Sequence, residues 1–410
     1  MTLSLMIDAR SADSSPSGIG NYTAHLLSEL AAMGAELDIT LVRRRGWTKP
    51  LAPNARVVLA PGDTKSAWTP AIGPLLRLHA AHTSQSDGRY TTSASSSQSN
   101  RRDAAGAPFS QDSSPNAARV YHSPADLVPF GAPRPWVVTL HDLMWIEAPE
   151  LCSAHAPERR VNALWYRLHI ERAVRGARRL IAISQATADA IRRVFPSAAD
   201  KVRVVHHGVD HERFSALGGE PRELIDAWVP RGVRYWLIVG QGSPYKNHAG
   251  MIRAYLDALG ERADQRLVLV RRFSRVDKEL SELLARPEVA RRVIQIPAAP
   301  GEVLLALYRH AHAVLFASHE EGFGLPALEA MAMGVPVLTS TAPALVEVTQ
   351  GGALHAPSRD HAALVDALRA MDSDDDLIQR LRQRGPERAR QFSWRRTAEQ
   401  TLAVYREASD

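Results

Sequence analysis

The sequence predicts an α/β protein with two doubly wound, parallel-sheet domains that face each other across a cleft. The first observation is a rhythm: short apolar runs rich in β-branched residues alternate with helix-length segments along most of the chain. Such strands, apolar on both sides, are typical of parallel sheets that helices cover on both faces. The second observation is length, because 410 residues exceed what one ordinary hydrophobic core needs.

The candidate strands form two sets, and each set predicts one Rossmann-like sheet. The first set is LSLMIDA, DITLVRR, ARVVLA, WVVTLHD, RRLIAIS and VRVVHHGV, and the second is RYWLIVG, RLVLVRR, RRVIQIP, HAVLFAS and VPVLTST. Glycines and a proline interrupt the rhythm over 210–231. We therefore expect an N-terminal domain at 1–212 and a C-terminal domain at 213–390. A last helix at 391–410, capped by Ser393, could pack back on the N-terminal domain.

One segment of the first domain, 82–117, differs in composition from the rest. It is rich in Ser, Thr, Gln and Gly and poor in apolar residues, so it cannot bury enough surface to offset its ordering entropy. This composition predicts a flexible insertion, which is either a lid over a substrate or an insertion that the fold merely tolerates.

The composition limits the environment and the partners of the protein. Cys152 is the single cysteine, so no disulfide can form within the chain, which fits a reducing cytosol. Asp8 and Arg10 come too early for a signal peptide, and no window approaches 18 uninterrupted apolar residues. The net charge of +6 suits phosphorylated small molecules, acidic lipid headgroups or nucleic acid, although a general richness in arginine explains it as well.

The stretch from Ser318 to Ser340 carries the clearest chemistry. The strand AVLFAS runs into the turn HEEGFGLP, where Pro326 is a natural first residue of a helix that Gly334 then ends. Free backbone N–H groups and the helix dipole favour phosphate at such a turn. Gly322 and Gly324 allow a ligand to approach the backbone closely.

Two carboxylates, Glu321 and Glu329, lie eight residues apart in this otherwise apolar stretch. We expect Glu329 in the first helical turn, where its side chain leans back toward the cleft and can accept two hydrogen bonds from a ribose diol. Glu321, on the turn, can then bind another part of the same ligand. The spacing indicates a grip on a nucleotide sugar; a helix-capping carboxylate plus a solvent-facing glutamate is the structural alternative.

The segment EGFGLPALEAMAMGVPV resembles the E-x7-E signature of retaining glycosyltransferases of family four, which have the GT-B fold. The resemblance covers most of the chain and is strongest over 234–354. Further similar pieces are SGIGNYT, VVTLHD, IAIS, HHGVD and FSW. Their order is most similar to bacterial mannosyl- or rhamnosyltransferases that build surface polysaccharides such as O-antigen, lipopolysaccharide or exopolysaccharide.

The resemblance implies the reaction and its partners. A hexose would pass from a nucleotide sugar, GDP-mannose or a related GDP-sugar, to a glycan or polyprenyl-diphosphate-linked acceptor, with retention at the anomeric carbon. No metal and no cofactor is expected, and no nucleic acid partner. The acceptor would lie against the N-terminal domain and the donor against the C-terminal domain. The protein would be cytoplasmic, with peripheral contact at the inner face of the cytoplasmic membrane.

The resemblance also assigns roles to residues. Glu321 and His141 are the implied catalytic residues, and the acceptor-side loop and strand-end residues are Gly18, Gly20, Asp142 and Ser184. The implied donor-binding residues are Gly240, Lys246, Glu321, Gly322, Phe323, Gly324, Leu325 and Glu329. A strand-capping histidine is the alternative for His141, which together with Asp142 falls at a strand's carboxyl end, where parallel-sheet proteins bind ligands.

One position departs from the family pattern. Lys246 matches the family's diphosphate lysine, but Gln241 stands where an arginine is often found. Arg271 or Arg272 could supply the missing cation, and solvent-exposed arginines are the alternative.

The basic segment from Glu158 to Arg179 has two interpretations. Its apolar residues recur at helical spacing, at Ala163, Tyr166, Ile170, Ala173 and Ala177. An amphipathic basic helix can lie on an anionic membrane surface, or it can pack on its own sheet. The acidic run at 372–376 is interpreted as helix capping, not as a metal site.

Two other functions stay open at this stage. A synthase, epimerase or hydrolase that acts on nucleotide sugars could use the same pair of glutamates. A basic protein that binds nucleic acid or acidic lipid would fit the charge, but would leave Glu321 and Glu329 without a role.

Overall fold

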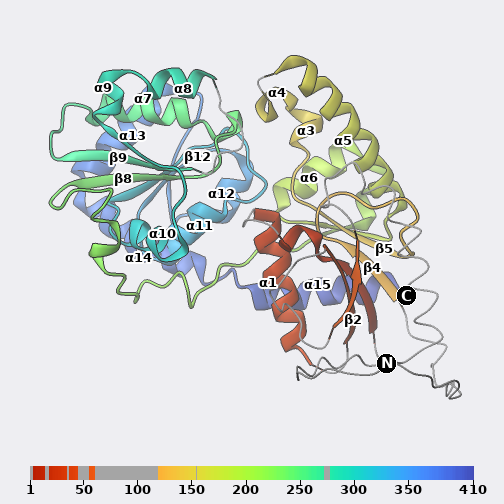
Figure 1. Cartoon of the computed structure of the whole chain (residues 1–410). Coiled ribbons are helices and arrows are strands. Elements are labelled where there is room, and N and C mark those ends of the chain that lie inside the picture. The colour runs from red at the N-terminus through yellow and green to blue at the C-terminus, as the bar shows by residue number, and fades with distance from the viewer. Residues whose placement is uncertain are drawn as a thin grey trace, which may run out of the picture.

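The computed structural model describes residues 3–13, 18–34, 37–44, 55–60, 119–153, 155–271 and 278–410. The insertion predicted at 82–117 and Arg272 lie outside these residues. Figure 1 shows two lobes, each with a sheet at its centre and helices on both faces.

The first sheet has seven parallel strands in the order β3-β2-β1-β4-β5-β6-β7. Its strands are β1 (Leu3–Asp8), β2 (Leu37–Arg43), β3 (Arg56–Leu59), β4 (Arg119–Ser123), β5 (Trp136–Leu140), β6 (Arg179–Ala182) and β7 (Val202–Val204). Its helices are α1 (Gly18–Ala32), α3 (Met144–Glu147), α4 (Pro149–Cys152), α5 (Ala156–Gly176) and α6 (Gln185–Val194), with 3-10 turns η1 (Ala9–Asp13) and η3 (Pro196–Lys201). All five residues of β5 are buried, as expected for a central strand covered on both faces.

The second sheet has six parallel strands in the order β10-β9-β8-β11-β12-β13. Its strands are β8 (Arg234–Val239), β9 (Gln265–Val270), β10 (Val293–Ile296), β11 (Ala313–Phe316), β12 (Val337–Ser340) and β13 (Leu354–Ala356). Its helices are α7 (His248–Leu259), α8 (Lys278–Leu284), α9 (Pro287–Ala290), α10 (Gly301–Arg309), α11 (Leu325–Ala332), α12 (Pro343–Thr349), α13 (His361–Ser373) and α14 (Asp375–Ala389), with 3-10 turns η4 (Arg222–Ile225) and η5 (Pro244–Lys246). The predicted pair of doubly wound parallel sheets is therefore confirmed.

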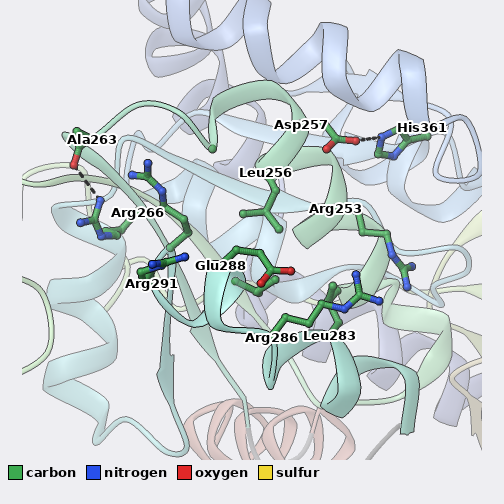
Figure 2. Close-up of a pocket in the computed structure, with 13 residues that line it drawn as sticks. Arg253, Leu256, Asp257, Ala263, Arg266, Leu283, Arg286, Glu288, Arg291 and His361 are labelled. Carbon is green, nitrogen blue, oxygen red and sulfur yellow. Dashed lines mark hydrogen bonds and ion pairs between the residues drawn. The ribbon is translucent and has the colours of Figure 1, made fainter.

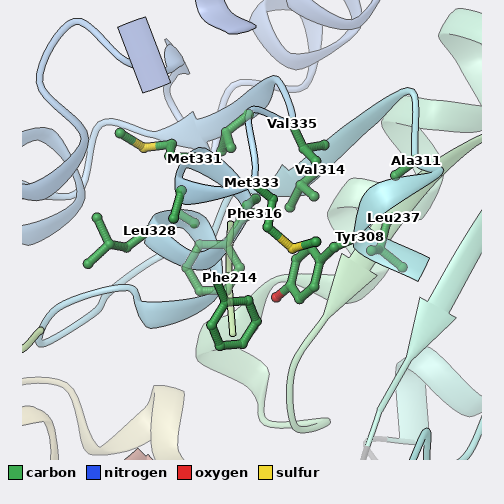
Figure 3. Packing of buried hydrophobic residues seen from close by; sticks show 14 of the residues in the cluster. Phe214, Leu237, Tyr308, Ala311, Val314, Phe316, Leu328, Met331, Met333 and Val335 are labelled. Atoms are coloured by element: carbon green, nitrogen blue, oxygen red, sulfur yellow. The ribbon is translucent and has the colours of Figure 1, made fainter. Parts of the chain in front are cut away.

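The packing of β11 shows why its sequence is apolar throughout. Val314 and Phe316 belong to one core cluster, whereas Ala313 and Leu315 belong to a second cluster on the opposite face. Side chains of a strand alternate between faces, so a strand covered on both sides needs apolar residues at every position. Figure 3 shows the first of these clusters, in which Tyr308 lies between Phe214 and Met333.

The last helix, α15 (Trp394–Ser409), packs on the first domain although it follows the second sheet in sequence. Trp394, Ala398 and Tyr405 share a core cluster with residues of β1 and α1. The Tyr405 hydroxyl also lies 2.7 Å from Nδ1 of His122. The chain thus crosses between the lobes twice, and the two crossings meet where Val209 bridges to Ser393.

The acidic run at 372–376, which begins inside α13, includes the helix cap that the sequence predicted. Asp374 caps α14 by accepting a hydrogen bond from the Leu377 amide at 2.8 Å. Asp372 is bound to Arg262 at 2.8 Å. None of the helices in the described part of the chain is long and apolar enough to cross a membrane.

Candidate functional site

Lys246 and Glu321 form a buried ion pair at the carboxyl ends of two neighbouring strands. The chain places Lys246 in η5, shortly after β8, and Glu321 in the turn after β11, and these two strands are paired. Nζ of Lys246 lies 2.6 Å from Oε1 of Glu321, and their side chains are only 11% and 9% exposed. Burial disfavours the ammonium charge, but the attraction of Glu321 and its hydrogen bond outweigh it, so the pKa of Lys246 is raised.

The turn after Glu321 brings the second domain into contact with the first. A Cβ atom on Gly322 would lie 2.0 Å from the carbonyl oxygen of His141, so only glycine fits at this contact. Gly324 has φ of +101° and precedes α11, a conformation that favours glycine. Phe323 is buried in the second domain's core, and the partly buried Leu325 packs against core clusters of both domains.

Glu329 lies in α11, one residue further into the helix than the sequence analysis placed it. The helix begins at Leu325, so Glu329 is its fifth residue and not part of the first turn. Its Oε2 accepts a hydrogen bond of 3.1 Å from the Tyr308 hydroxyl. Burial raises the pKa of Glu329 to about 7, although the Tyr308 hydrogen bond and the charge of Arg213 act in the opposite direction. Its side chain keeps partial contact with solvent.

These contacts decide against the structural alternative for the two glutamates. The N-cap of α11 is Gly324 and no side chain caps it, so Glu329 is not a capping residue. Glu321 is buried against Lys246 and does not face solvent. Both carboxylates are therefore held inside the molecule by specific partners.

His141 follows β5 on the first domain and is 7% exposed. Its Nε2 lies 2.8 Å from the Pro124 carbonyl oxygen, which can only accept, so this nitrogen carries a proton. Its backbone amide donates to Oδ1 of Asp126 at 2.9 Å. The structure thus places His141 on the first domain, directly opposite the Gly322 turn of the second.

The other residues predicted on the acceptor side have distinct environments. Asp142 accepts a hydrogen bond from the Met144 amide at 2.9 Å, and its negative charge contributes to the raised pKa of Lys246. Gly18 is the first residue of α1 and Gly20 is buried in the same helix. Ser184 is fully buried, caps α6 by accepting from the Thr187 amide at 3.0 Å, and also donates to the Thr187 hydroxyl.

Of the two arginines that could supply a second cation near Lys246, only Arg271 lies within the described residues. Arg271 is 7% exposed, which contradicts the expectation of a solvent-exposed arginine. His248 lies close to Gly240, and its pKa falls to about 3 because of burial and the positive charges of Lys246 and Arg271. Gln241 instead donates its amide to the Tyr245 hydroxyl at 2.8 Å.

His207, in the piece HHGVD that follows a strand of the first sheet, lies where the two domains meet, as expected for a cleft-lining residue at a strand end. It is 3% exposed, stacked on Tyr22 at 4.8 Å and 5.0 Å from Phe323. Among the described residues its ring nitrogens have no hydrogen-bond partner, and burial lowers its pKa well below the usual value.

Glu347 was missed by sequence reasoning, and it joins the two domains directly. From α12 its carboxylate accepts hydrogen bonds from the amides of Gln185 at 2.7 Å and Ala186 at 3.0 Å, the first residues of α6. His206 Nε2 lies 2.6 Å from the same carboxylate. A carboxylate at a helix N-terminus is favoured by the free amides and the dipole, so Glu347 fastens the second domain to the first.

Glu347→Gln is expected to lower the thermal unfolding midpoint at pH 7 more than at pH 4. Burial raises the pKa of Glu347, but the hydrogen bonds from His206 and the two amides outweigh it and leave the pKa lowered. A lowered pKa in the folded protein stabilises it above the ordinary glutamate pKa, and this contribution is lost as the pH falls through the folded value. Exposed Glu261→Gln is the control, and a difference between Glu347→Gln and wild type that grows toward low pH would contradict the role.

This arrangement, two parallel-sheet domains with a charged pair at the carboxyl ends of β8 and β11, is typical of the GT-B class of glycosyltransferase folds. The family model described as Glycosyl transferases group 1 matches residues 228–388, and the one described as Glycosyltransferase Family 4 matches residues 116–213. D-inositol 3-phosphate glycosyltransferase of Actinosynnema mirum is 32% identical over 295 residues, which cover 67% of this chain and 67% of that protein. The chain therefore belongs to the group 1 glycosyltransferases.

Two further comparisons extend this result. O-antigen chain mannosyltransferase B of Escherichia coli is 28% identical over 288 residues, which cover 70% of this chain and 74% of that protein. HepE from Anabaena, solved in complex with UDP and glucose, has a TM-score of 0.67 and 17% identity, with 98% of this chain and 99% of that one covered. The likeness to HepE shows the fold alone, and the predicted GT-B fold is confirmed.

Proposed function

We propose that this glycosyltransferase transfers a hexose, with retention and without a metal, from a nucleotide sugar to a glycan or polyprenyl-diphosphate-linked acceptor. The observation that carries the proposal is the buried Lys246–Glu321 pair, which lies beside the contact between Gly322 and His141. A cation, a carboxylate and glycine amides at the carboxyl ends of parallel strands form a site for a diphosphate joined to a sugar.

Each residue has one task in this proposal. Lys246 and the free amides of the turn hold the diphosphate and stabilise its charge as the sugar departs. Glu329 accepts hydrogen bonds from the ribose hydroxyls, and Glu321 and His141 position the sugar. The acceptor oxygen attacks from the face that the diphosphate leaves, and its proton passes to the departing phosphate oxygen. No residue is required as a covalent nucleophile.

For the donor, the proposal is GDP-mannose or a related GDP-sugar, and for the pathway a bacterial surface polysaccharide. The O-antigen chain mannosyltransferase of Escherichia coli supports this choice at 28% identity. D-inositol 3-phosphate glycosyltransferases match as well, and HepE was solved with UDP and glucose, so UDP-sugars are the second candidate donors.

A thermal-shift screen without added metal tests the donor class. GDP, UDP, ADP, dTDP and their common sugars are compared, since a ligand at 100 times its Kd stabilises the fold by about 2.7 kcal/mol. We expect one nucleotide to raise the melting temperature, and Lys246→Ala or Glu329→Ala to abolish the rise. A rise that both variants retain would place the ligand elsewhere, and no rise with any nucleotide would contradict the donor site.

Donor affinity is expected to increase as the pH rises through 7. Ribose hydroxyls donate to the charged form of Glu329, so binding lowers its pKa from about 7 and releases a proton. The intact nucleotide sugar should be titrated calorimetrically in buffers of different ionisation heat, because its esterified diphosphate does not itself titrate near neutrality. Glu329→Gln should remove the proton release. Release that persists in this variant would assign the proton to another group.

Helix α5 supports the proposed peripheral membrane contact, through residues other than those the sequence analysis selected. Ile170, Ala173 and Ala177 are buried in the first domain's core, which confirms the packing interpretation for that face. A second apolar face points outward, where Val161, Leu164 and Leu168 are 68%, 60% and 56% exposed. Their i, i+3, i+7 spacing aligns them on one side of the helix. The same helix also carries exposed arginines, Arg160 and Arg167 among them.

The Leu164→Glu/Leu168→Glu variant is expected to lose most binding to vesicles that contain anionic lipid, measured by co-sedimentation at low salt. The apolar side chains would enter the membrane interface while the arginines bind the anionic headgroups. Two glutamates in place of the leucines remove the apolar contact, and their negative charges are repelled by the headgroups. Leu217→Glu, at a side chain 96% exposed on another segment, is the control. Equal binding by both variants would contradict a membrane role for α5.

A further inference from the structure

A separate pocket of about 1020 Å³ lies on the second domain (Figure 2). Its lining residues come from α7, from the start of β9 and the turn before it, from α8, α9 and the link between them, from the turn before β10, and from the start of α13. The Lys246–Glu321 pair lies at the carboxyl ends of strands, whereas this pocket reaches the amino ends of β9 and β10. No lining residue belongs to the first domain, so the pocket is distinct from the site between the domains.

The lining carries a surplus of positive charge. Five arginines, Arg253, Arg266, Arg286, Arg291 and Arg292, face two carboxylates, Asp257 and Glu288, which leaves a surplus of three. Asp257 is already bound to His361 at 2.7 Å, and Arg253 to Glu279 at 2.7 Å. Within the described residues, the side chains of Arg286 and Arg291 make no hydrogen bond or ion pair. Guanidinium groups gathered around one hollow repel each other, and a bound anion would relieve that repulsion.

Part of this arrangement is fixed before any ligand binds. Nη1 of Arg266 donates to the carbonyl oxygens of Ala263 at 2.9 Å and Gln265 at 2.7 Å. Nη1 of Arg292 donates to the carbonyl oxygen of Arg262 at 2.9 Å. Each guanidinium keeps further N–H groups that can bind a phosphate through two parallel hydrogen bonds. The buried side chains of Leu283 and Val289 contribute apolar surface to the lining.

The layout of the charges indicates the class of ligand. Figure 2 shows Arg266 and Arg291 on one side, Arg253 and Arg286 on the other, and Leu256 and Glu288 between them. The Glu288 carboxylate would repel a ligand that is anionic along its whole length, whereas it can accept hydrogen bonds from hydroxyl groups in the middle of a ligand. We propose that this pocket binds a sugar or polyol that carries phosphate groups at two ends, and that it is a ligand site separate from the donor site.

Calorimetric titration with fructose 1,6-bisphosphate as the probe tests the proposal, and it needs no transfer activity. We expect wild type and Lys246→Gln, which can still donate a hydrogen bond to Glu321, to bind alike, and Arg286→Gln/Arg291→Gln to bind at least 10-fold more weakly. Arg380→Gln/Arg384→Gln, at two exposed arginines of α14, removes the same charge elsewhere and should bind as wild type does. Equal binding by the Arg286/Arg291 variant, or loss of binding in a folded Lys246→Gln variant alone, would overturn the proposal.

Inorganic tripolyphosphate distinguishes a bisphosphate site from a general polyanion site. We expect wild type to bind it more weakly than the bisphosphate at the same ionic strength. Glu288→Gln should strengthen tripolyphosphate binding several-fold and should not strengthen binding of the bisphosphate. Tighter binding of tripolyphosphate by wild type would contradict the part assigned to Glu288 and with it the proposed ligand class.

Discussion

Replacing Glu321 with glutamine is expected to lower the transfer rate by about 10²–10³-fold, the usual cost of losing one preorganised contact to the transition state. Glutamine keeps the shape and can still accept a hydrogen bond from Lys246, but it carries no charge. Alanine is a poorer test, because Lys246 would remain buried without a partner, and breaking a buried ion pair typically costs about 3–5 kcal/mol. The pair is only 11% and 9% exposed, so this penalty applies here.

The measurement is the initial rate with saturating donor, alongside the melting temperature of each variant. Glu320→Gln is a matched control, because Glu320 is the adjacent residue but is exposed. We expect the control to keep most of its activity. A Glu321→Gln enzyme that is folded and works within a few-fold of wild type would remove Glu321 from the reaction.

Gly322→Ala is expected to abolish most transfer for a different reason, namely the loss of domain contact at the site. The new methyl group would lie 2.0 Å from the His141 carbonyl oxygen, a separation that no pair of non-bonded atoms tolerates. The turn and the end of β5 must therefore move apart. A displacement of about 1 Å at reacting groups can cost 10²-fold in rate, so a loss of that order is expected.

This prediction is checked by the transfer rate together with small-angle scattering of the free enzyme. Gly219→Ala is the control, because a Cβ atom there would meet nothing within 4 Å. We expect Gly322→Ala to scatter as a more open molecule and Gly219→Ala to match wild type. Full activity in Gly322→Ala would show that the closed contact is not the reactive arrangement.

Much of the fold could be predicted from local pattern alone. Most strands are short apolar runs separated by helix-length segments, and this spacing predicted the two parallel sheets. The strands β4 (RVYHS) and β13 (LHA) were not predicted, because neither is a continuous apolar run. The E-x7-E stretch also located Glu321 and Glu329, since chemistry in such folds gathers at strand ends. The position of Glu329 in its helix was wrong by one residue, because the helix boundary depends on the backbone at Gly324, which sequence pattern does not resolve.

The features that sequence could not predict depend on how distant segments meet. Glu347 contacts amides that are 161 and 162 positions earlier in the chain, and nothing near it in sequence indicates that contact. His207 is buried only because residues of both domains and α15 surround it. Helix α5 has an inner and an outer apolar face, and periodicity alone could not tell which of them the sheet covers.

The central claim, retaining transfer at the Lys246–Glu321 pair, is tested most directly by following the anomeric proton of the sugar. The enzyme is incubated with the nucleotide sugar that gives the largest thermal shift, and proton NMR records the first sugar product, whether transferred or released to water. The account predicts that this product keeps the donor's anomeric configuration and forms about 10²–10³-fold more slowly in Glu321→Gln. An inverted product, or equal rates in the two enzymes, would contradict it.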